Sequence, residues 1–221
     1  MKPYYQDEHV ILYHADCLQH LDILDTADVL VTDPPYGMDY QSARRSDNPL
    51  DRIKGDQDTE TRDAVIAAWG DKPALVFGRW SVQAPRNEKQ RLIWWKEGNP
   101  GMGNLNMPFG PAHEDIHLLG TGWDRKSTGL PRIGSVIPTR GLRGGSHGEE
   151  NATGHPTPKP VALMEFLIKR CPPGIIIDPF AGSGSTLRAA KNLGRSAIGF
   201  EIEEKYCAIA AERLAQEVLA L

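Results

Sequence analysis

The chain has 221 residues, of which 40% are hydrophobic and 24% charged, and its formal net charge is −4. This length suits one domain of ordinary size, and the hydrophobic fraction is enough for a buried core. No apolar run approaches the length that crosses a bilayer, and the first residues do not form a signal peptide, so we expect a cytoplasmic protein with no membrane partner. Cys17, Cys171 and Cys207 are scattered and odd in number, which argues against a disulfide framework and a zinc cluster.

Apolar runs predict seven strands, and apolar residues at helical spacing predict five helices. The strands are expected at 10–13, 29–32, 74–77, 92–95, 116–119, 175–177 and 197–201, and the helices at 16–24, 59–69, 160–171, 186–193 and 203–219. In the first helix Asp16 is the candidate N-cap, and Leu18, Leu21 and Leu24 are expected to form the buried face. The alternation of strands and helices favours an α/β fold with a doubly wound, mostly parallel, seven-stranded sheet.

The turn Asp33-Pro34-Pro35-Tyr36 follows the predicted strand 29–32. Neither proline has an N–H, so the chain leaves the sheet here, at the carboxyl end of the strand, where open α/β sheets bind ligands. The turn offers the Asp33 carboxylate, backbone carbonyls and the Tyr36 ring. These groups suit a planar base with an exocyclic amine, because the oxygens accept its hydrogens while the ring stacks on the base. A proline-rich turn without a ligand is the alternative that these residues alone leave open.

A glycine-containing segment, 178–186, follows the predicted strand 175–177. Gly182 and Gly184 would let the backbone approach a ligand where any side chain would collide. The next predicted strand ends in Glu201, the place where a βαβ unit holds a ribose diol. Since Leu187 stands where a third glycine is usual and no lysine follows Gly184, we expect a nucleoside pocket, not a dinucleotide fingerprint or a P-loop.

Together the two segments resemble the amino-group DNA methyltransferases that use S-adenosylmethionine. The turn 33–36 is similar to their catalytic motif, and Phe180-Ala181-Gly182-Ser183-Gly184 is similar to their cofactor motif. The catalytic motif comes first here, as in the β group of the family, which implies a Rossmann-like methyltransferase fold with permuted motif order. His155-Pro156-Thr157-Pro158-Lys159-Pro160 resembles the HPTQKP element of the family, with Pro158 where glutamine is usual.

The resemblance implies methyl transfer to an amino group of a base that has left the duplex stack. Asp33 favours N6 of adenine, since family members that act on N4 of cytosine more often carry serine there. Cytosine N4 is the alternative, and a catalytically silent cofactor- or DNA-binding protein is the alternative from another class. The catalytic candidates are Asp33, Pro34, Pro35 and Tyr36, and the cofactor-binding candidates are Asp16, Cys17, Asp33, Lys159, Asp178, Phe180, Ala181, Gly182, Ser183, Gly184 and Glu201.

Within the candidate cofactor site, the resemblance assigns the ribose hydroxyls to Glu201 and the adenine amine to Asp16. Lys159 and Asp178 are candidates for the methionine end; the alternatives are a solvated lysine at a helix start and an aspartate that caps its own turn. Phe180 either packs against the adenine or fills the core.

We expect a single methyltransferase domain over 1–221, with 120–154 as a short insertion like a target-recognition region. This insertion and the charged segment 38–58, interpreted as ordering over substrate, supply the DNA-binding candidates Arg44, Arg45, Arg125, Lys126, Arg132, Arg140 and Arg143. Solvated loops are the alternative for both segments. The acidic net charge counts mildly against nucleic-acid binding but leaves a local basic face open. DNA is the implied partner in a bacterial or phage-infected cell, and a homodimer and a cognate restriction nuclease are left open.

One further motif, His113-Glu114-Asp115-Ile116-His117, matches the zinc-binding pattern HExxH, which requires a helix. Gly110 and Pro111 precede it and its apolar residues alternate, so a strand is predicted. On a strand the two histidines would stand roughly 13 Å apart, too far for one metal ion. No metal site is therefore predicted.

Overall fold

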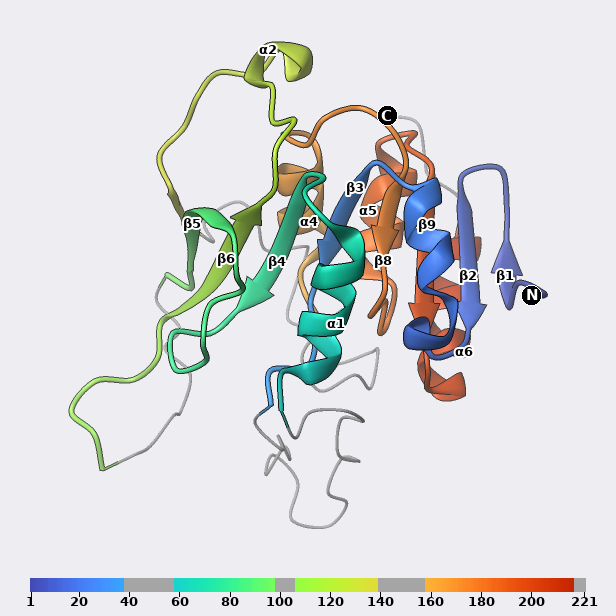
Figure 1. Ribbon diagram of the computed structural model, residues 1–221, viewed down its shortest axis with the longest axis horizontal. Coiled ribbons are helices and arrows are strands. Elements are labelled where there is room, and N and C mark those ends of the chain that lie inside the picture. The colour runs from blue at the N-terminus through green and yellow to red at the C-terminus, as the bar shows by residue number, and fades with distance from the viewer. Residues whose placement is uncertain (38–57, 98–105, 139–157, 217–221) are drawn as a thin grey trace.

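The computed structural model describes residues 1–37, 58–97, 106–138 and 158–216. Within these residues nine strands form one sheet in the order β1-β2-β9-β8-β3-β4-β6-β5-β7 (Figure 1). The strands are β1 (Tyr5–Gln6), β2 (Val10–His14), β3 (Val29–Thr32), β4 (Ala74–Gly78), β5 (Glu88–Trp95), β6 (His113–Leu119), β7 (Val136–Pro138), β8 (Ile176–Asp178) and β9 (Ala197–Glu201). The five central neighbours, β2, β9, β8, β3 and β4, are parallel.

All seven predicted strands are present and most neighbouring pairs are parallel, but the predicted number of seven is wrong, because the described residues form nine strands. The sheet is mixed, because β6 runs antiparallel to both β4 and β5, and β1 runs antiparallel to β2. β1 and β7 are two and three residues long, too short to produce a hydrophobic period in the sequence. Strand direction depends on pairing partners, which a period of two does not reveal.

Helices cover both faces of this sheet, as predicted. η1 (Cys17–Thr26) and α1 (Glu60–Trp69) lie on one face, and α4 (Val161–Ile168), α5 (Ser185–Asn192) and α6 (Glu204–Ala215) lie on the other (Figure 1). The short α2 (Arg125–Thr128) stands apart from both layers. Among the described residues, no helix has both the length and the apolar composition needed to span a membrane.

The first predicted helix, η1, differs from expectation in its type and its buried face. It is a 3₁₀ helix, and Asp16 caps it as predicted by accepting a hydrogen bond from the Leu18 N–H at 3.0 Å. His20 has φ −139° and ψ 38°, which interrupts the helix. Leu18 is 37% exposed, whereas Leu24 is buried. The prediction that three leucines share one buried face is therefore wrong.

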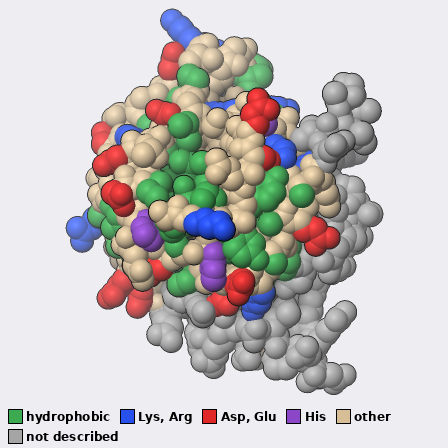
Figure 2. Space-filling view, turned by 90° about the vertical axis from the view of Figure 1, so that its right-hand side faces the viewer, with side chains coloured by type: hydrophobic (Ala, Val, Ile, Leu, Met, Phe, Trp, Pro, Cys, Tyr) green, Lys and Arg blue, Asp and Glu red, His purple; other side chains and the backbone are tan. Residues whose placement is uncertain are grey.

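The face of the molecule around β1 and α6 carries a mixed population of charges. Figure 2 shows acidic and basic side chains interspersed on this face, with hydrophobic side chains between them. This face therefore carries neither a continuous basic patch nor a continuous acidic one, which agrees with the small net charge of −4.

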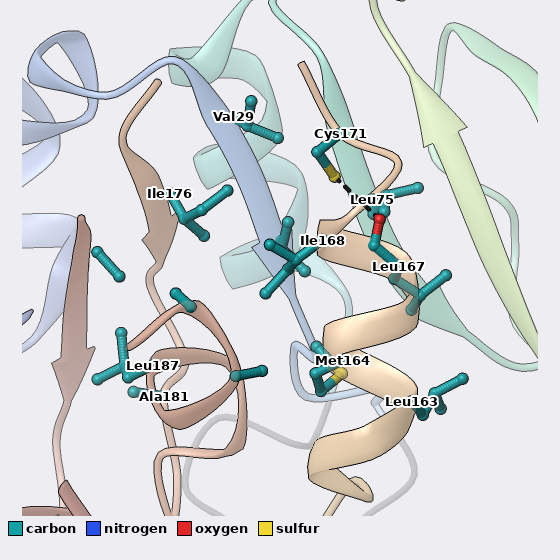
Figure 3. Packing of buried hydrophobic residues seen from close by; sticks show 14 of the residues in the cluster. Val29, Leu75, Leu163, Met164, Leu167, Ile168, Cys171, Ile176, Ala181 and Leu187 are labelled. Atoms are coloured by element: carbon teal, nitrogen blue, oxygen red, sulfur yellow. Dashed lines mark hydrogen bonds between the residues drawn. The ribbon is translucent and has the colours of Figure 1, made fainter. Parts of the chain in front are cut away.

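The core lies on both sides of β3, all four residues of which are buried. Val29 and Val31 belong to a cluster with α4 and α5, whereas Leu30 belongs to a cluster with η1 and α1. Figure 3 shows Leu163, Met164, Leu167 and Ile168 on the side of α4 that faces the sheet. Each such side chain contributes about 1.5–3 kcal/mol when fully buried. An uninterrupted apolar strand is the expected sequence for this two-sided burial.

Candidate active site

Four of the predicted acidic residues lie at one edge of the sheet. The parallel strands β2, β9, β8 and β3 are consecutive neighbours, so their carboxyl ends lie side by side. Asp16 and Asp33 follow β2 and β3, while Asp178 and Glu201 are the last residues of β8 and β9. Residues from opposite ends of the chain thus meet at the edge where open α/β sheets bind ligands.

A buried hydrogen bond joins the two turns directly. The Thr32 hydroxyl donates to Oδ1 of Asp178 at 2.7 Å, and the same oxygen accepts from the Phe180 N–H at 3.1 Å. Burial raises the pKa of Asp178 to about 6. These contacts are those of an aspartate that caps its own turn. Thr32 was not among the sequence candidates; its signal was a hydroxyl at the end of an otherwise aliphatic strand.

Glu201 holds the glycine turn against the end of β9. Its Oε2 accepts from the Gly182 N–H at 2.8 Å, and its Oε1 accepts from the Glu203 N–H at 2.7 Å. Gly182 has a positive φ of 51°. The carboxylate is buried, and burial raises its pKa. Each carboxylate oxygen has a second lone pair, so this acid beside the glycine turn fits the two hydroxyls of a ribose.

Gly184 has a structural role that the sequence did not reveal. It is the N-cap of α5 with a φ of 79°, a backbone conformation that glycine adopts without strain. A Cβ atom at this position would lie 2.9 Å from the Cβ of Ala210 on α6. Gly184 is therefore required by the turn and by the close packing of two helices, whatever the site binds.

The remaining cofactor candidates around these turns use their side chains mainly in packing. Cys17 belongs to the core on the η1 side, and burial raises the pKa of its thiol to about 12. Phe180 packs partly buried against the same cluster. Ala181 and Ser183 are buried, and the Ala181 N–H donates to the Phe200 carbonyl at 2.8 Å.

The catalytic candidate Asp33 has both carboxylate oxygens occupied. The Tyr36 hydroxyl donates to Oδ1, and Nζ of Lys159 lies 2.5 Å from Oδ2. Lys159 lies directly before Pro160, the N-cap of α4, and its side chain is only 7% exposed, so the alternative of a solvated lysine is wrong. Pro34 is buried and Pro35 half-buried, which fixes the backbone around Asp33.

A second carboxylate, missed by the sequence analysis, completes this cluster. Oε2 of Glu114 lies 3.3 Å from Nζ of Lys159, and Lys96 pairs with Oε1 of Glu114. Glu114 comes from β6 and Lys96 follows β5, and both strands lie beyond β4. In the sequence Glu114 belonged to an accidental HExxH match, and the antiparallel placement of β6 is what brings it to this edge.

The charges of this cluster shift the pKa values of Asp33, Lys159 and Glu114. Burial raises the pKa of Asp33; Lys159 opposes this shift, and Glu114 adds to it. Burial by itself lowers the pKa of Lys159, but the two carboxylates raise it, and the net shift is upward. Burial raises the pKa of Glu114, yet Lys159 and Lys96 lower it more, and the net shift is downward. These shifts reflect a buried cluster of two carboxyl groups, Asp33 and Glu114, and two ammonium groups, Lys96 and Lys159.

The HExxH residues lie on β6, a strand as predicted. Nδ1 of His117 lies 2.8 Å from Oε1 of Glu88, whereas Nε2 of His113 lies 3.9 Å from Asp115. Among the residues that the structure describes, no group of three or more His, Cys, Asp or Glu side chains is placed to hold a metal ion.

The structure does not bring the described DNA-binding candidates to the Asp33 turn. β6 ends at Leu119, which pairs with Ala74 at the start of β4, so the chain that follows lies at the opposite edge of the sheet. This chain includes α2, and Figure 1 shows α2 at the end of the molecule away from the carboxyl end of β3. Arg125 and Lys126 are on α2, and Arg132 lies between α2 and β7; Arg44, Arg45, Arg140 and Arg143 lie outside the described residues.

The doubly wound sheet, the rigid Asp33 turn and the acid-bound glycine turn together define a methyltransferase of the Rossmann-like type. A model of the DNA methylase family N6_N4_Mtase matches residues 79–212, and the chain belongs to this family. The protein YubD of Escherichia coli K12 is 49% identical over 219 residues, which cover 91% of this chain and 88% of YubD. The Type II methyltransferase M.ScaI of Streptomyces caespitosus is 28% identical over 266 aligned residues, which cover all of this chain and 86% of M.ScaI.

Solved structures agree with this assignment. The crystal structure of the M1.HpyAVI-SAM complex matches with a TM-score of 0.64 and 26% identity, over 94% of this chain and 100% of that chain. The cytosine-N4-specific PvuII DNA methyltransferase matches with a TM-score of 0.73, but its 17% identity shows a shared fold only. The predicted Rossmann-like fold type and family are confirmed, with S-adenosylmethionine as the cofactor and DNA as the substrate.

Proposed function

We propose that this protein transfers a methyl group from S-adenosylmethionine to N6 of adenine in DNA. The observation that carries the proposal is the junction of the Asp33 turn and the glycine turn, which the hydrogen bond from Thr32 to Asp178 ties together at one sheet edge. Membership of the N6/N4 family supports methylation of an amino group in DNA. The choice of adenine is supported by Asp33, because family members that act on cytosine more often carry serine at that position.

The residues of the turn activate a poor nucleophile. The lone pair of an exocyclic amine is delocalised into the base, and hydrogen bonds to the Asp33 carboxylate and the Pro34 carbonyl favour a nitrogen that approaches tetrahedral geometry. Tyr36 stacks on the extruded base and offsets part of the few kcal/mol that extrusion costs. When bound, S-adenosylmethionine supplies a methyl group on a positively charged sulfur. The proton that the methylated nitrogen loses passes to Asp33, whose pKa is raised by burial.

For the cofactor, we propose that Glu201 accepts the ribose hydroxyls while the backbone at Gly182 approaches the ligand. Asp16 accepts from the adenine amine. The two assignments are compatible because β2, which Asp16 follows, is the neighbour of β9, which ends in Glu201. The side chains of Cys17, Phe180, Ala181 and Ser183 and the backbone of Gly184 shape the walls of this site, and Asp178 fixes the turn.

We also propose that the whole chain is one catalytic domain. β7, from the segment 120–154, pairs with β5 and so extends the same sheet, which supports this view. The assignments of the seven arginine and lysine side chains to DNA contacts stay predictions, as do a homodimer and a cognate restriction nuclease.

The direct test is to express the protein in a host without DNA methylation and to sequence its genome for modified bases. The proposal predicts N6-methyladenine within a defined sequence. N4-methylcytosine would contradict the choice of base but retain the mechanism at Asp33. An unmodified genome, with cofactor binding shown by calorimetry, would instead favour a catalytically silent binding protein.

A further inference from the structure

Lys159 lies between two carboxylates that come from different strands. Its Nζ is 2.5 Å from Oδ2 of Asp33 and 3.3 Å from Oε2 of Glu114. The other oxygen of Glu114 is held by Lys96. Asp33 follows β3 and Glu114 lies on β6, with β4 between these strands, so the sheet itself sets the spacing of the two acids.

This arrangement has a consequence for the binding of a target base at Asp33. Oδ1 of Asp33 accepts from Tyr36 and Oδ2 accepts from Lys159. Each oxygen keeps a second lone pair, but the ammonium group at 2.5 Å draws on the same negative charge, so Asp33 accepts the amine of a base most strongly once Lys159 has moved away. A buried ammonium cannot simply be released, because an unpaired charge in a low-dielectric site is costly. Lys159 therefore needs a second acceptor within reach, and Glu114 is that acceptor.

We propose that Glu114 is a positioning residue that takes over the Lys159 ammonium when Asp33 accepts the amine of the target base. No covalent bond changes in this exchange, and the charges of the cluster are conserved. The inference rests on the proposed function at Asp33 and adds a residue that this function does not require by itself.

The surroundings support a short movement of the ammonium group. Lys96 keeps Glu114 in place from the other side, and its Nζ lies 4.8 Å from the centre of the Trp94 ring. Nζ of Lys159 lies 5.1 Å from the centre of the Phe77 ring and 5.8 Å from that of Tyr36. Aromatic faces attract cations, so Lys159 keeps favourable contacts as it changes carboxylate.

The proposal predicts a distinctive pH dependence for Glu114→Gln. The charged groups that act on Asp33 are Lys159, which lowers its pKa, and Glu114, which raises it; Asp33 in turn raises the pKa of Asp178. Removing the Glu114 charge therefore lowers the pKa of Asp33 and leaves Lys159 paired with Asp33 alone. Because Asp33 accepts the amine when ionised, the acid limb of kcat/KM moves to lower pH.

The experiment compares Glu114→Gln with a matched control, Asp7→Asn. Nζ of Lys191 lies 2.5 Å from Oδ2 of Asp7, the same distance that separates Lys159 from Asp33. Asp7 lies between β1 and β2, and β9 and β8 separate β2 from β3, which Asp33 follows. We expect Glu114→Gln to lower kcat about tenfold, which corresponds to roughly 1.4 kcal/mol, and to shift the acid limb downward. The Kd for S-adenosylmethionine should stay within about twofold, and Glu114→Asp should restore the acid limb. Asp7→Asn should change neither kcat nor the pH profile.

Wild-type kcat and pH profile in Glu114→Gln would overturn the proposal, as would a loss of cofactor affinity that matches the loss of turnover. The assay uses whichever base the wild-type enzyme methylates, so failure of the adenine assignment does not affect it. If the wild type methylates no base, the proposed function fails, and carboxyl-carbon NMR of the free protein decides the inference: an Asp33 pKa that is unchanged in Glu114→Gln would overturn it.

Discussion

At the scale of single residues, the chemistry depends on how each carboxylate oxygen is used. Asp33 has one oxygen for Tyr36 and one for Lys159, whereas Glu201 uses both oxygens to fix backbone N–H groups. The first arrangement exchanges partners when a substrate binds, and the second holds a turn in place. The two acids should therefore separate turnover from cofactor affinity.

Replacing Asp33 by alanine removes the acceptor for the target amine. We expect Asp33→Ala to lower kcat by about 10²–10⁴-fold, while the Kd for S-adenosylmethionine changes little. Transfer of a labelled methyl group to DNA and calorimetric titration of the cofactor measure the two quantities. Asp22→Ala, at an exposed aspartate of η1, is the control and should leave both unchanged. Wild-type turnover in Asp33→Ala would show that the mechanism is wrong.

Replacing Glu201 by glutamine should have the opposite signature. Glutamine keeps one acceptor oxygen but places an NH₂ group against one of the two N–H donors, so a charged hydrogen bond and its ribose contact are lost. A loss of about 1.5–3 kcal/mol raises the Kd for the cofactor by about 10–150-fold. Turnover at saturating cofactor should be largely retained. A variant that binds cofactor normally but has lost turnover would argue against the assignment of Glu201.

At the scale of elements, the sequence predicted what depends on local pattern. The apolar strand β3, the rigid turn after it and the glycine turn after β8 are each visible in a few adjacent residues. Glu114 was missed because its role depends on the antiparallel insertion of β6 between β4 and β5. The distance of Arg125 from the Asp33 turn was missed for the same reason, since β6 carries the chain to the opposite edge. Pairing between distant strands has no local signature.

The packing of α5 on α6 supplies a test at this scale. Gly184→Ala introduces both a strained φ of 79° and a Cβ that lies 2.9 Å from that of Ala210. Gly194→Ala introduces a similar φ of 65° but meets nothing within 4 Å. We expect the control to lose about 1–2 kcal/mol of unfolding free energy and Gly184→Ala to lose about 1–3 kcal/mol more. Equal losses in urea denaturation would show that helix packing does not require Gly184.

At the scale of the whole molecule, the first strands are tied to a helix from the far end of the chain. Nζ of Lys191 on α5 lies 2.5 Å from Oδ2 of Asp7, and Oδ1 of Asp7 accepts from the N–H groups of His9 and Val10 at 2.8 Å. Burial opposes the effect, but these donors and Tyr5 lower the pKa of Asp7 to about 2. This pair thus stabilises the outer part of the sheet.

The lowered pKa of Asp7 predicts how this stabilisation depends on pH. Because the folded-state pKa is below the unfolded value, the contribution is complete above about pH 4 and is lost as the pH falls toward 2. The Asp7 side chain is 22% exposed, so we expect Asp7→Asn to cost about 1–2 kcal/mol at pH 7 and only a small part of this near pH 2. Urea denaturation across this range measures the difference between variant and wild type. A difference that is constant from pH 7 to pH 2 would contradict the ion-pair explanation.

We propose that segments from both ends of the chain form one cleft for cofactor and base at the carboxyl edge of the sheet. A crystal structure with S-adenosylmethionine and a DNA duplex that contains the target sequence would show whether they do. We predict ribose hydroxyls on Glu201, an extruded base against Tyr36, and its amino nitrogen at Asp33, about 3–3.5 Å from the methyl carbon. A cofactor bound away from the Gly182 turn, or a base that does not reach Tyr36, would contradict the account.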